Sequence, residues 1–132
     1  MGKFCVMAEQ NFSESGVCNL NGNAWIKPPM GWFKANVDEA ATLRSLQAGC
    51  GGVFRDAMGA WLFGFTKSLG TCSAQMVEEW SVFEALQCAW EMGIRKLILE
   101  SDAQIVLDLI ADPDYNSGSL LMVEIRELRN RD

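Results

Sequence analysis

The order of hydrophobic periods along residues 32–101 constrains the fold of this chain more than any other feature. From Trp32 the side chains alternate, with Phe33, Ala35 and Val37 on one face and Lys34, Asn36 and Asp38 on the other. Alternation of this kind predicts a half-buried strand that ends at Asp38. Two apolar runs follow, at residues 50–55 and 60–66, around the turn sequence Asp56-Ala57-Met58-Gly59. These runs predict a hairpin, so the first three strands form an antiparallel meander.

A helical period replaces the strand period after Ser73. Ser73 is a suitable N-cap for a helix over residues 74–92, and Gly93 can close that helix in the left-handed conformation. The apolar stripe of the helix comprises Met76, Trp80, Phe83, Leu86 and Trp90. An adjacent face carries the smaller residues Val82, Ala85 and Ala89, which suit close packing on a sheet. One turn towards the N-terminus, this face reaches Glu78.

The rest of the chain predicts one more strand and two shorter helices. Residues 96–101 form a compact apolar strand, and Asp102 is a suitable N-cap for the helix after it. Asp112-Pro113-Asp114 ends that helix, and Ser119 begins the last one. A strand that follows a crossover helix joins the sheet parallel to an earlier strand, with right-handed connection. The predicted fold class is therefore α/β, with three antiparallel strands, a parallel fourth strand and helices packed on the sheet.

Residues 1–24 differ from the rest in composition. They are rich in Asn, Ser, Gly and Glu without a sustained period, so we expect a flexible lead-in before a folded domain over residues 25–132. The chain has five cysteines, none in a C-x-x-C pair and none after an export signal, which is typical of reduced thiols. No apolar run reaches the ~18 residues of a membrane span. We expect a soluble intracellular protein with no membrane partner, in the nucleus or the cytoplasm.

Composition excludes several kinds of chemistry. The chain has no histidine, which excludes Ser-His-Asp and Cys-His nucleophiles and zinc sites that need imidazole. Its 17 acidic and 11 basic residues give a net charge of −6, whereas dedicated nucleic-acid-binding proteins usually carry a basic patch. A carboxylate site filled by cations is compatible with this charge, because bound divalent ions reverse the local potential.

Three acids occupy special places in the predicted elements. Asp38 lies at a strand end, Glu78 in the first turn of the long helix, and Asp102 at the junction of strand and helix. If the first and fourth strands are parallel neighbours, Asp38 and Asp102 lie side by side at the edge where α/β sheets bind ligands. Converging carboxylates suit hard divalent cations, and two such ions can hold both oxygens of a phosphodiester displacement. The alternative is that each acid only caps its helix or complements a helix dipole.

Four motifs in this order resemble the plant ribonuclease H-like domains related to reverse-transcriptase-associated RNase H. The entry segment is Trp25–Asp38, and the second and third strands match at Gly49–Asp56 and Gly59–Trp61. Val77-Glu78-Glu79-Trp80-Ser81 resembles the family's Ala-Glu-Leu-Trp-Ala helix motif, and Glu100-Ser101-Asp102 its Glu-Ser-Asp. The resemblance runs from Trp25 to the end of the sequence.

This resemblance implies an RNase H fold and endonucleolytic cleavage of the RNA strand of RNA–DNA hybrids. The family uses two Mg²⁺ ions, for which Mn²⁺ can substitute. Carried over position by position, Asp38, Glu78 and Asp102 correspond to three of the family's four metal-binding acids. They are thus the expected catalytic and metal-binding residues, and an RNA–DNA hybrid is the expected partner.

The sequence departs from the family pattern in two places. Glu39 stands where the family usually has glycine after the first aspartate, and it adds bulk and charge beside the site. The sequence also ends at Asp132, before the fifth strand, the last helix and the fourth acid that the family pattern includes. We therefore expect an incomplete domain whose fourth strand has an unpaired edge, which lowers stability or promotes association.

Three functions remain open at this point. The first is a hybrid-cleaving nuclease, and the second is a catalytically inactive, truncated relic that binds nucleic acid or protein weakly. The third is a structural or protein-interaction fragment, which would account for the acidity and the tryptophans. The presence of Asp38, Glu78 and Asp102 favours the first function over the third, and the missing fourth acid favours the second.

Overall fold

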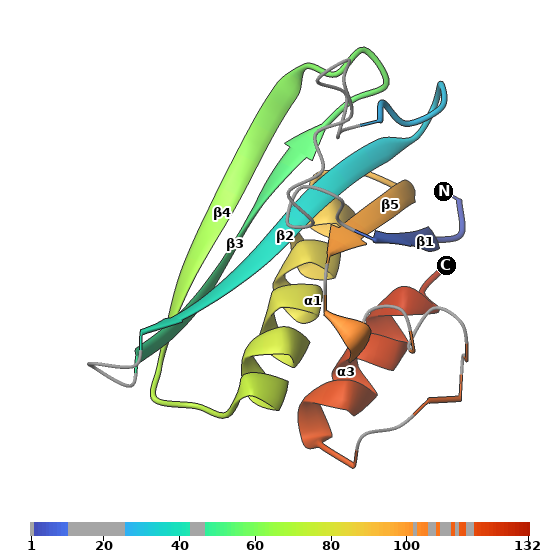
Figure 1. The fold of residues 1–132 in the computed structure, drawn as a ribbon. Helices are drawn as coiled ribbons and strands as arrows, with labels where there is room; N and C mark the ends of the chain where they lie inside the picture. The colour runs from blue at the N-terminus through green and yellow to red at the C-terminus, as the bar shows by residue number, and fades with distance from the viewer. Residues whose placement is uncertain are drawn as a thin grey trace.

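The computed structural model describes residues 2–10, 26–42, 47–101, 103–105, 108, 112, 114, 115 and 118–132. Its strands are β1 (Cys5–Gln10), β2 (Phe33–Thr42), β3 (Gln47–Arg55), β4 (Trp61–Gly70) and β5 (Lys96–Ser101), and its helices are α1 (Ala74–Glu91) and α3 (Leu120–Arg129). The five described strands form one sheet in the order β1-β5-β2-β3-β4. Helices α1 and α3 lie on the same side of this sheet (Figure 1).

Strands β2, β3 and β4 form the predicted antiparallel meander, and β5 pairs in parallel with β2. The hairpin turn between β3 and β4 is closed by a hydrogen bond of 3.1 Å from the Asp56 amide to the Ala60 carbonyl oxygen. The Asp56 carboxylate accepts bonds from the amides of Met58 and Ala60, and Gly59 has a φ of 83°. The predicted mixed α/β sheet is confirmed.

Strand β2 is longer than its alternating pattern predicted. It continues past Asp38 to Thr42, because its antiparallel pairing with β3 runs on from Asp38↔Gly51 to Thr42↔Gln47. The prediction that the strand ends at Asp38 is therefore wrong. The glycines of β3 do not interrupt this ladder. A Cβ atom on Gly52 would lie 2.5 Å from the Phe65 ring, so the bare backbone at this position is what allows Phe65 to pack.

Helix α1 has the predicted signals at both ends. The Ser73 hydroxyl accepts a hydrogen bond of 3.1 Å from the Met76 amide, and Gly93 has a φ of 83°. Its small-residue face is the one that packs against the sheet, because Val82, Ala85 and Ala89 are all buried. The aromatic members of the predicted stripe are half-buried at the rim of the core. The face closest to the sheet is thus made of small side chains, as close approach requires.

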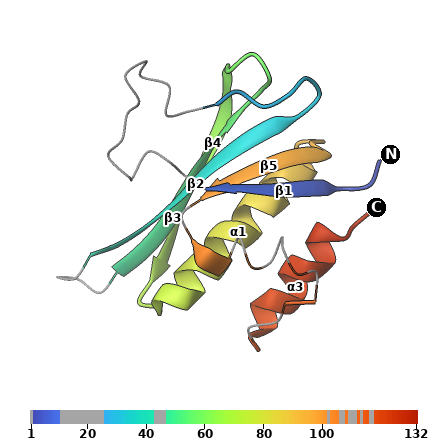
Figure 2. The ribbon, with the colours of Figure 1, turned by 45° about the vertical axis from the view of Figure 1, so that its right-hand side comes forward.

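The first part of the chain corrects two expectations. Residues 1–24 were expected to form a flexible lead-in, but Cys5–Gln10 form β1, which pairs in parallel with β5 along its whole length. The edge of β5 that we expected to be unpaired is therefore covered, and β1 is the edge strand in its place (Figure 2). Residues 11–24 lie outside the described residues.

The C-terminal part of the chain is described in pieces. Gln104, Ile105 and Asp108 are helical and Ala103 is not, while Asp102 and residues 106, 107 and 109–111 of that predicted helix lie outside the described residues. The predicted last helix is confirmed as α3, whose N-cap Ser119 accepts a hydrogen bond from the Met122 amide. Met122 and Ile125 of α3 are fully buried against the shared core. Within the described ranges, no helix is long and apolar enough to cross a membrane.

Candidate acidic site

Asp38 lies in β2 just beyond the stretch that pairs with β5. The last register pair between these strands is Asn36↔Glu100, and on its other side Asp38 pairs with Gly51 of β3. Its side chain is exposed. The carboxylate of Asp38 is therefore accessible to a ligand from solvent, next to the carboxyl end of β5.

Glu78 lies one position beyond the first turn of α1, not within it as predicted, because the helix begins at Ala74. Its side chain is half-buried, and its charge acts on Glu39 of β2. The predicted continuation of the Val82–Ala85–Ala89 face to Glu78 is consistent with this position. Asp102, the third predicted acid, lies outside the described residues, and nothing is concluded about its side chain.

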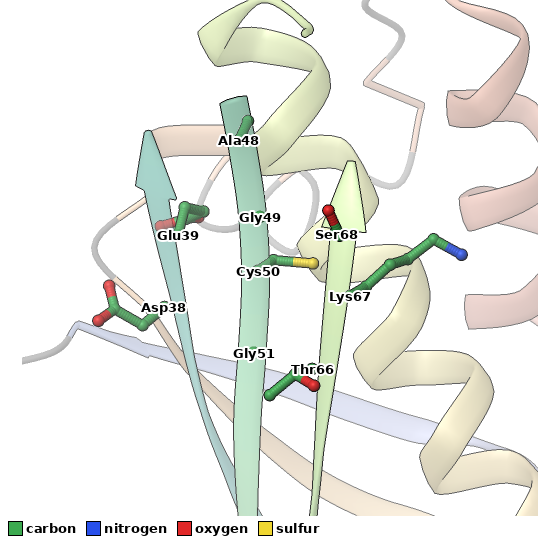
Figure 3. Close-up of a pocket in the computed structure, with 9 residues that line it drawn as sticks. All are labelled: Asp38, Glu39, Ala48, Gly49, Cys50, Gly51, Thr66, Lys67 and Ser68. Carbon is green, nitrogen blue, oxygen red and sulfur yellow. The ribbon is translucent and has the colours of Figure 1, made fainter. Parts of the chain in front are cut away.

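Glu39 occupies the space between β2 and α1. The Ser81 hydroxyl is fully buried and lies 3.2 Å from Oε1 of Glu39 and 2.7 Å from the carbonyl oxygen of Glu78. Successive strand residues point to opposite faces, so Glu39 faces the helix while Asp38 faces away from it. Figure 3 shows the two side chains leaving β2 in different directions.

The charges of Asp38 and Glu78 both act on Glu39. Burial is the main factor that raises the pKa of Glu39, and the carboxylates of Glu78 and Asp38 raise it further, while the hydrogen bond from Ser81 lowers it. Two of the three predicted acids, forty positions apart in the sequence, are thus within electrostatic range of the same carboxylate. Concentrated carboxylate charge of this kind favours a bound cation or a retained proton.

Three strands contribute to an open pocket of about 510 Å³ beside these acids (Figure 3). It is lined by Asp38 and Glu39 of β2, by residues 48–51 of β3 and by residues 66–68 of β4. Burial and nearby carboxylates raise the pKa of Cys50 to about 11, so its thiol stays protonated at neutral pH and is a poor nucleophile. Lys67 is paired with Glu84 of α1 at 3.0 Å, which directs its charge towards the helix.

The donor atoms around Asp38 and Glu78 are carboxylate oxygens, which are the ligands that Mg²⁺ and Mn²⁺ prefer. Among the described residues, no group of three or more acidic or cysteine side chains is arranged to hold one metal ion. The donor chemistry of Asp38 and Glu78 therefore suits a hard cation, and the described residues by themselves do not supply three ligands for one.

Sequence reasoning noted Glu39 but missed its contact with α1. The signal was present, because Glu39 continues the inward positions of Ala35 and Val37 in the same strand. Sequence reasoning also placed Lys34 on the solvent face of β2. Lys34 is in fact only 1% exposed, and it forms ion pairs with Glu9 and Glu100.

Comparison with known proteins agrees with this arrangement of strands and helices. The family described as "Reverse transcriptase-like" matches residues 36–131 of the chain. The chain belongs to the reverse transcriptase-like family. The matched residues of this reverse transcriptase-like chain include Asp38, Glu78 and Asp102, and they exclude β1.

A relative of this chain, and solved structures of other proteins similar to it, carry the ribonuclease H name. The chain is 38% identical over 86 residues to an Arabidopsis thaliana protein named "Putative ribonuclease H protein"; the match covers 65% of this chain and 14% of that protein. RNase H1 from Halobacterium salinarum superposes with a TM-score of 0.59 at 18% identity, over 74% of each chain. LC11-RNase H1, solved in complex with an RNA/DNA hybrid, gives 0.58 at 15% identity, over 74% of this chain and 78% of that one. The chain has an RNase H-like fold.

Proposed function

We propose that this chain binds RNA–DNA hybrids and cleaves their RNA strand with the help of divalent cations, through Asp38, Glu78 and Asp102. The family and the fold support nucleic-acid binding and an RNase H-type function in general. The observation that supports the finer proposal is that the charges of both Asp38 and Glu78 act on the carboxylate of Glu39. These two acids come from different elements, β2 and α1, and neither serves as the cap of its own element.

The role of the chain's own residues is to hold negative charge in a fixed place. Asp38, Glu78 and Asp102 would hold the cations, which when bound would supply an activated water and stabilise the leaving 3′ oxygen. Positive charge held at the reacting phosphate would offset the negative charge that develops there, and electrostatic stabilisation of this kind is worth on the order of 3 kcal/mol per group. The pocket beside Asp38 is open, which suits a duplex backbone better than a small molecule.

A second candidate is a module that binds hybrids without cleaving them. The favouring observation is Glu39, whose carboxylate lies between β2 and α1 and is fixed there by Ser81. The described residues also do not by themselves form a group of three metal ligands. In this alternative the acids remain, but the site does not bind the cations in a catalytic arrangement.

The test is cleavage of a labelled RNA–DNA hybrid in the presence of Mn²⁺. We expect slow cleavage of the RNA strand by the wild type, and a loss of roughly 10²–10³-fold in Asp38→Asn. Asp56→Asn is the matched control, because Asp56 lies in the β3–β4 turn and an asparagine oxygen can still accept its two backbone hydrogen bonds. Hybrid binding without any cleavage by the wild type would favour the second candidate. Equal cleavage by wild type and Asp38→Asn would remove Asp38 from the site.

A further inference from the structure

Strand β1 lies outside the family-matched residues but inside the sheet. The family match begins at residue 36, whereas β1 pairs with β5 from Cys5↔Lys96 to Gln10↔Ser101. Its position is at the sheet edge, on the side of β5 that faces away from β2 (Figure 2). A segment outside the recognised family region therefore completes the sheet next to the candidate site.

The beginning of β1 is held by several contacts. Phe4 is buried and its ring packs edge-on against Trp90 of α1, with ring centroids 5.5 Å apart. The amide of Phe4 donates to the carbonyl oxygen of Arg131 at 3.0 Å, and the amide of Cys5 donates to that of Arg95 at 2.8 Å. The strand is thus anchored to α1, to the segment before β5 and to the residues after α3.

The end of β1 takes part in a buried ionic cluster. Oε2 of Glu9 lies 2.9 Å from the Lys34 ammonium, and Oε2 of Glu100 lies 3.3 Å from it on the other side. The Lys34 ammonium also donates to the carbonyl oxygen of Ile26. An ammonium has three N–H donors, and a buried one is costly unless those donors are paired. The single ammonium group of Lys34 therefore contacts β1, β5 and the segment before β2.

This cluster is connected along β2 and β5 to the positions of two of the predicted acids. Glu100 pairs in register with Asn36 of β2 and also accepts a hydrogen bond from the Asn36 side chain. Asp38 is two residues beyond Asn36, and Asp102 is two residues beyond Glu100. The contacts of Lys34 and Asn36 with Glu100 thus set how the two strand segments that lead to these acids align.

We propose that β1 orders the carboxyl end of β5 beside the strand that carries Asp38, and that Lys34, held by Glu9 of β1, is the positioning residue for that end of β5. Lys34 acts through Glu100 and touches neither the hybrid nor a cation. Its positioning role for the active site rests on the proposed function above. The contribution of β1 to the order of β5 does not depend on the proposed function. The experiment can therefore contradict the proposed function without contradicting the role of β1, and the reverse.

The experiment uses the full chain with Lys34→Met, and with Glu9→Gln as a milder variant that keeps the Lys34–Glu100 pair. Lys96→Met, which replaces an exposed lysine of β5, is the matched control. The first measurement is amide hydrogen exchange of residues 97–101 without metal, compared with that of α3. We expect Lys34→Met to lose protection in β5 at least about tenfold while α3 keeps its own, since exchange reports local opening.

The second measurement is Mn²⁺ affinity at constant fraction folded, together with hybrid cleavage. We expect Lys34→Met to weaken Mn²⁺ binding about tenfold and to lower kcat with KM unchanged, which is typical of residues that orient metal ligands. Glu9→Gln should change β5 exchange and Mn²⁺ affinity in the same direction as Lys34→Met. If Lys34→Met does not fold, the result for Glu9→Gln tests the proposal by itself. Unchanged β5 exchange and unchanged Mn²⁺ affinity in folded Glu9→Gln and Lys34→Met would overturn the proposal. If the wild type neither binds Mn²⁺ nor cleaves, the nuclease function fails, and a loss of β5 protection still assigns β1 its role in ordering β5.

Discussion

Glu39 of β2 and Ser81 of α1 are joined by a hydrogen bond of 3.2 Å, and this contact ties the strand that carries Asp38 to the helix that carries Glu78. Ser81 is fully buried, and its hydroxyl also lies 2.7 Å from the carbonyl oxygen of Glu78 in its own helix. The spacing between the two acid-bearing elements therefore depends on a contact that the sequence alone did not reveal.

We expect Ser81→Ala to lower the free energy of unfolding by about 1 kcal/mol, the usual value of a buried hydrogen bond. The reason is that Glu39 would keep its half-buried position without its hydroxyl partner. Urea denaturation would measure the change. Ser68→Ala on β4, an exposed serine, should leave the unfolding midpoint unchanged. Identical midpoints for Ser81→Ala and the wild type would mean that the contact adds no stability.

Mild acid should stabilise the fold. Burial raises the pKa of both Glu39 and Glu100 above the ordinary 4.5, so each binds its proton more tightly in the folded chain than in the unfolded chain. Their stabilising contribution is present below the unfolded value and is lost as the pH rises through the folded value. We expect a higher Tm near pH 5 than near pH 8, and a flatter profile in Glu39→Gln. An unaltered profile in that variant would remove Glu39 as the cause.

The thiol of Cys50 should react slowly with alkylating reagents. Because burial and neighbouring carboxylates raise its pKa to about 11, only about one part in a thousand is thiolate near pH 8. Cys5 is exposed and provides the internal reference. Peptide mapping after brief iodoacetamide treatment of the native protein should find Cys5 modified and Cys50 intact. Rapid modification of Cys50 would require a more accessible and more ionised thiol than the structure has.

Gly52→Ala should destabilise the meander by about 1–3 kcal/mol, the usual cost of overpacking. The added methyl would lie 2.5 Å from the Phe65 ring, and Phe65 packs against the core through Phe54. Thermal unfolding would measure the loss. Gly2→Ala is the matched control, since nothing lies within 4 Å of the position its Cβ would take. Equal melting temperatures for the two variants would show that the ring can move away without cost.

Local signals predicted much of this fold, and contacts between distant segments account for what they missed. Ser73 and Gly93 mark α1 through interactions within a few residues, so the sequence was sufficient there. Strand β1 was missed because its run of six residues is short and its partner, β5, is about ninety positions away in the sequence. Its pairing depends on the position of β5 after the whole sheet has formed.

In the acidic site too, the features that depend on local sequence were predicted and those that depend on contacts between distant segments were missed. Asp38 and Glu78 were predicted from element positions and from a family resemblance, and the charges of both act on Glu39. Their role as site residues stays a prediction. The burial of Lys34 was not predictable, because strand alternation placed it on the solvent face beside Asn36 and Asp38. The carboxylates that neutralise the charge of Lys34 are those of Glu9 in β1 and Glu100 in β5. Sequence patterns do not show that these two strands lie beside β2 or beside each other.

The central claim is that Asp38 and Glu78 belong to one cation site, and a melting experiment with Mn²⁺ tests it most directly. A cation that binds only the folded chain raises Tm as its concentration exceeds the Kd. We expect millimolar Mn²⁺ to raise the Tm of the wild type and of Asp56→Asn, and to leave the Tm of Asp38→Asn and of Glu78→Gln nearly unchanged. A folded wild type whose Tm is indifferent to Mn²⁺, or equal increases in all four proteins, would contradict the account.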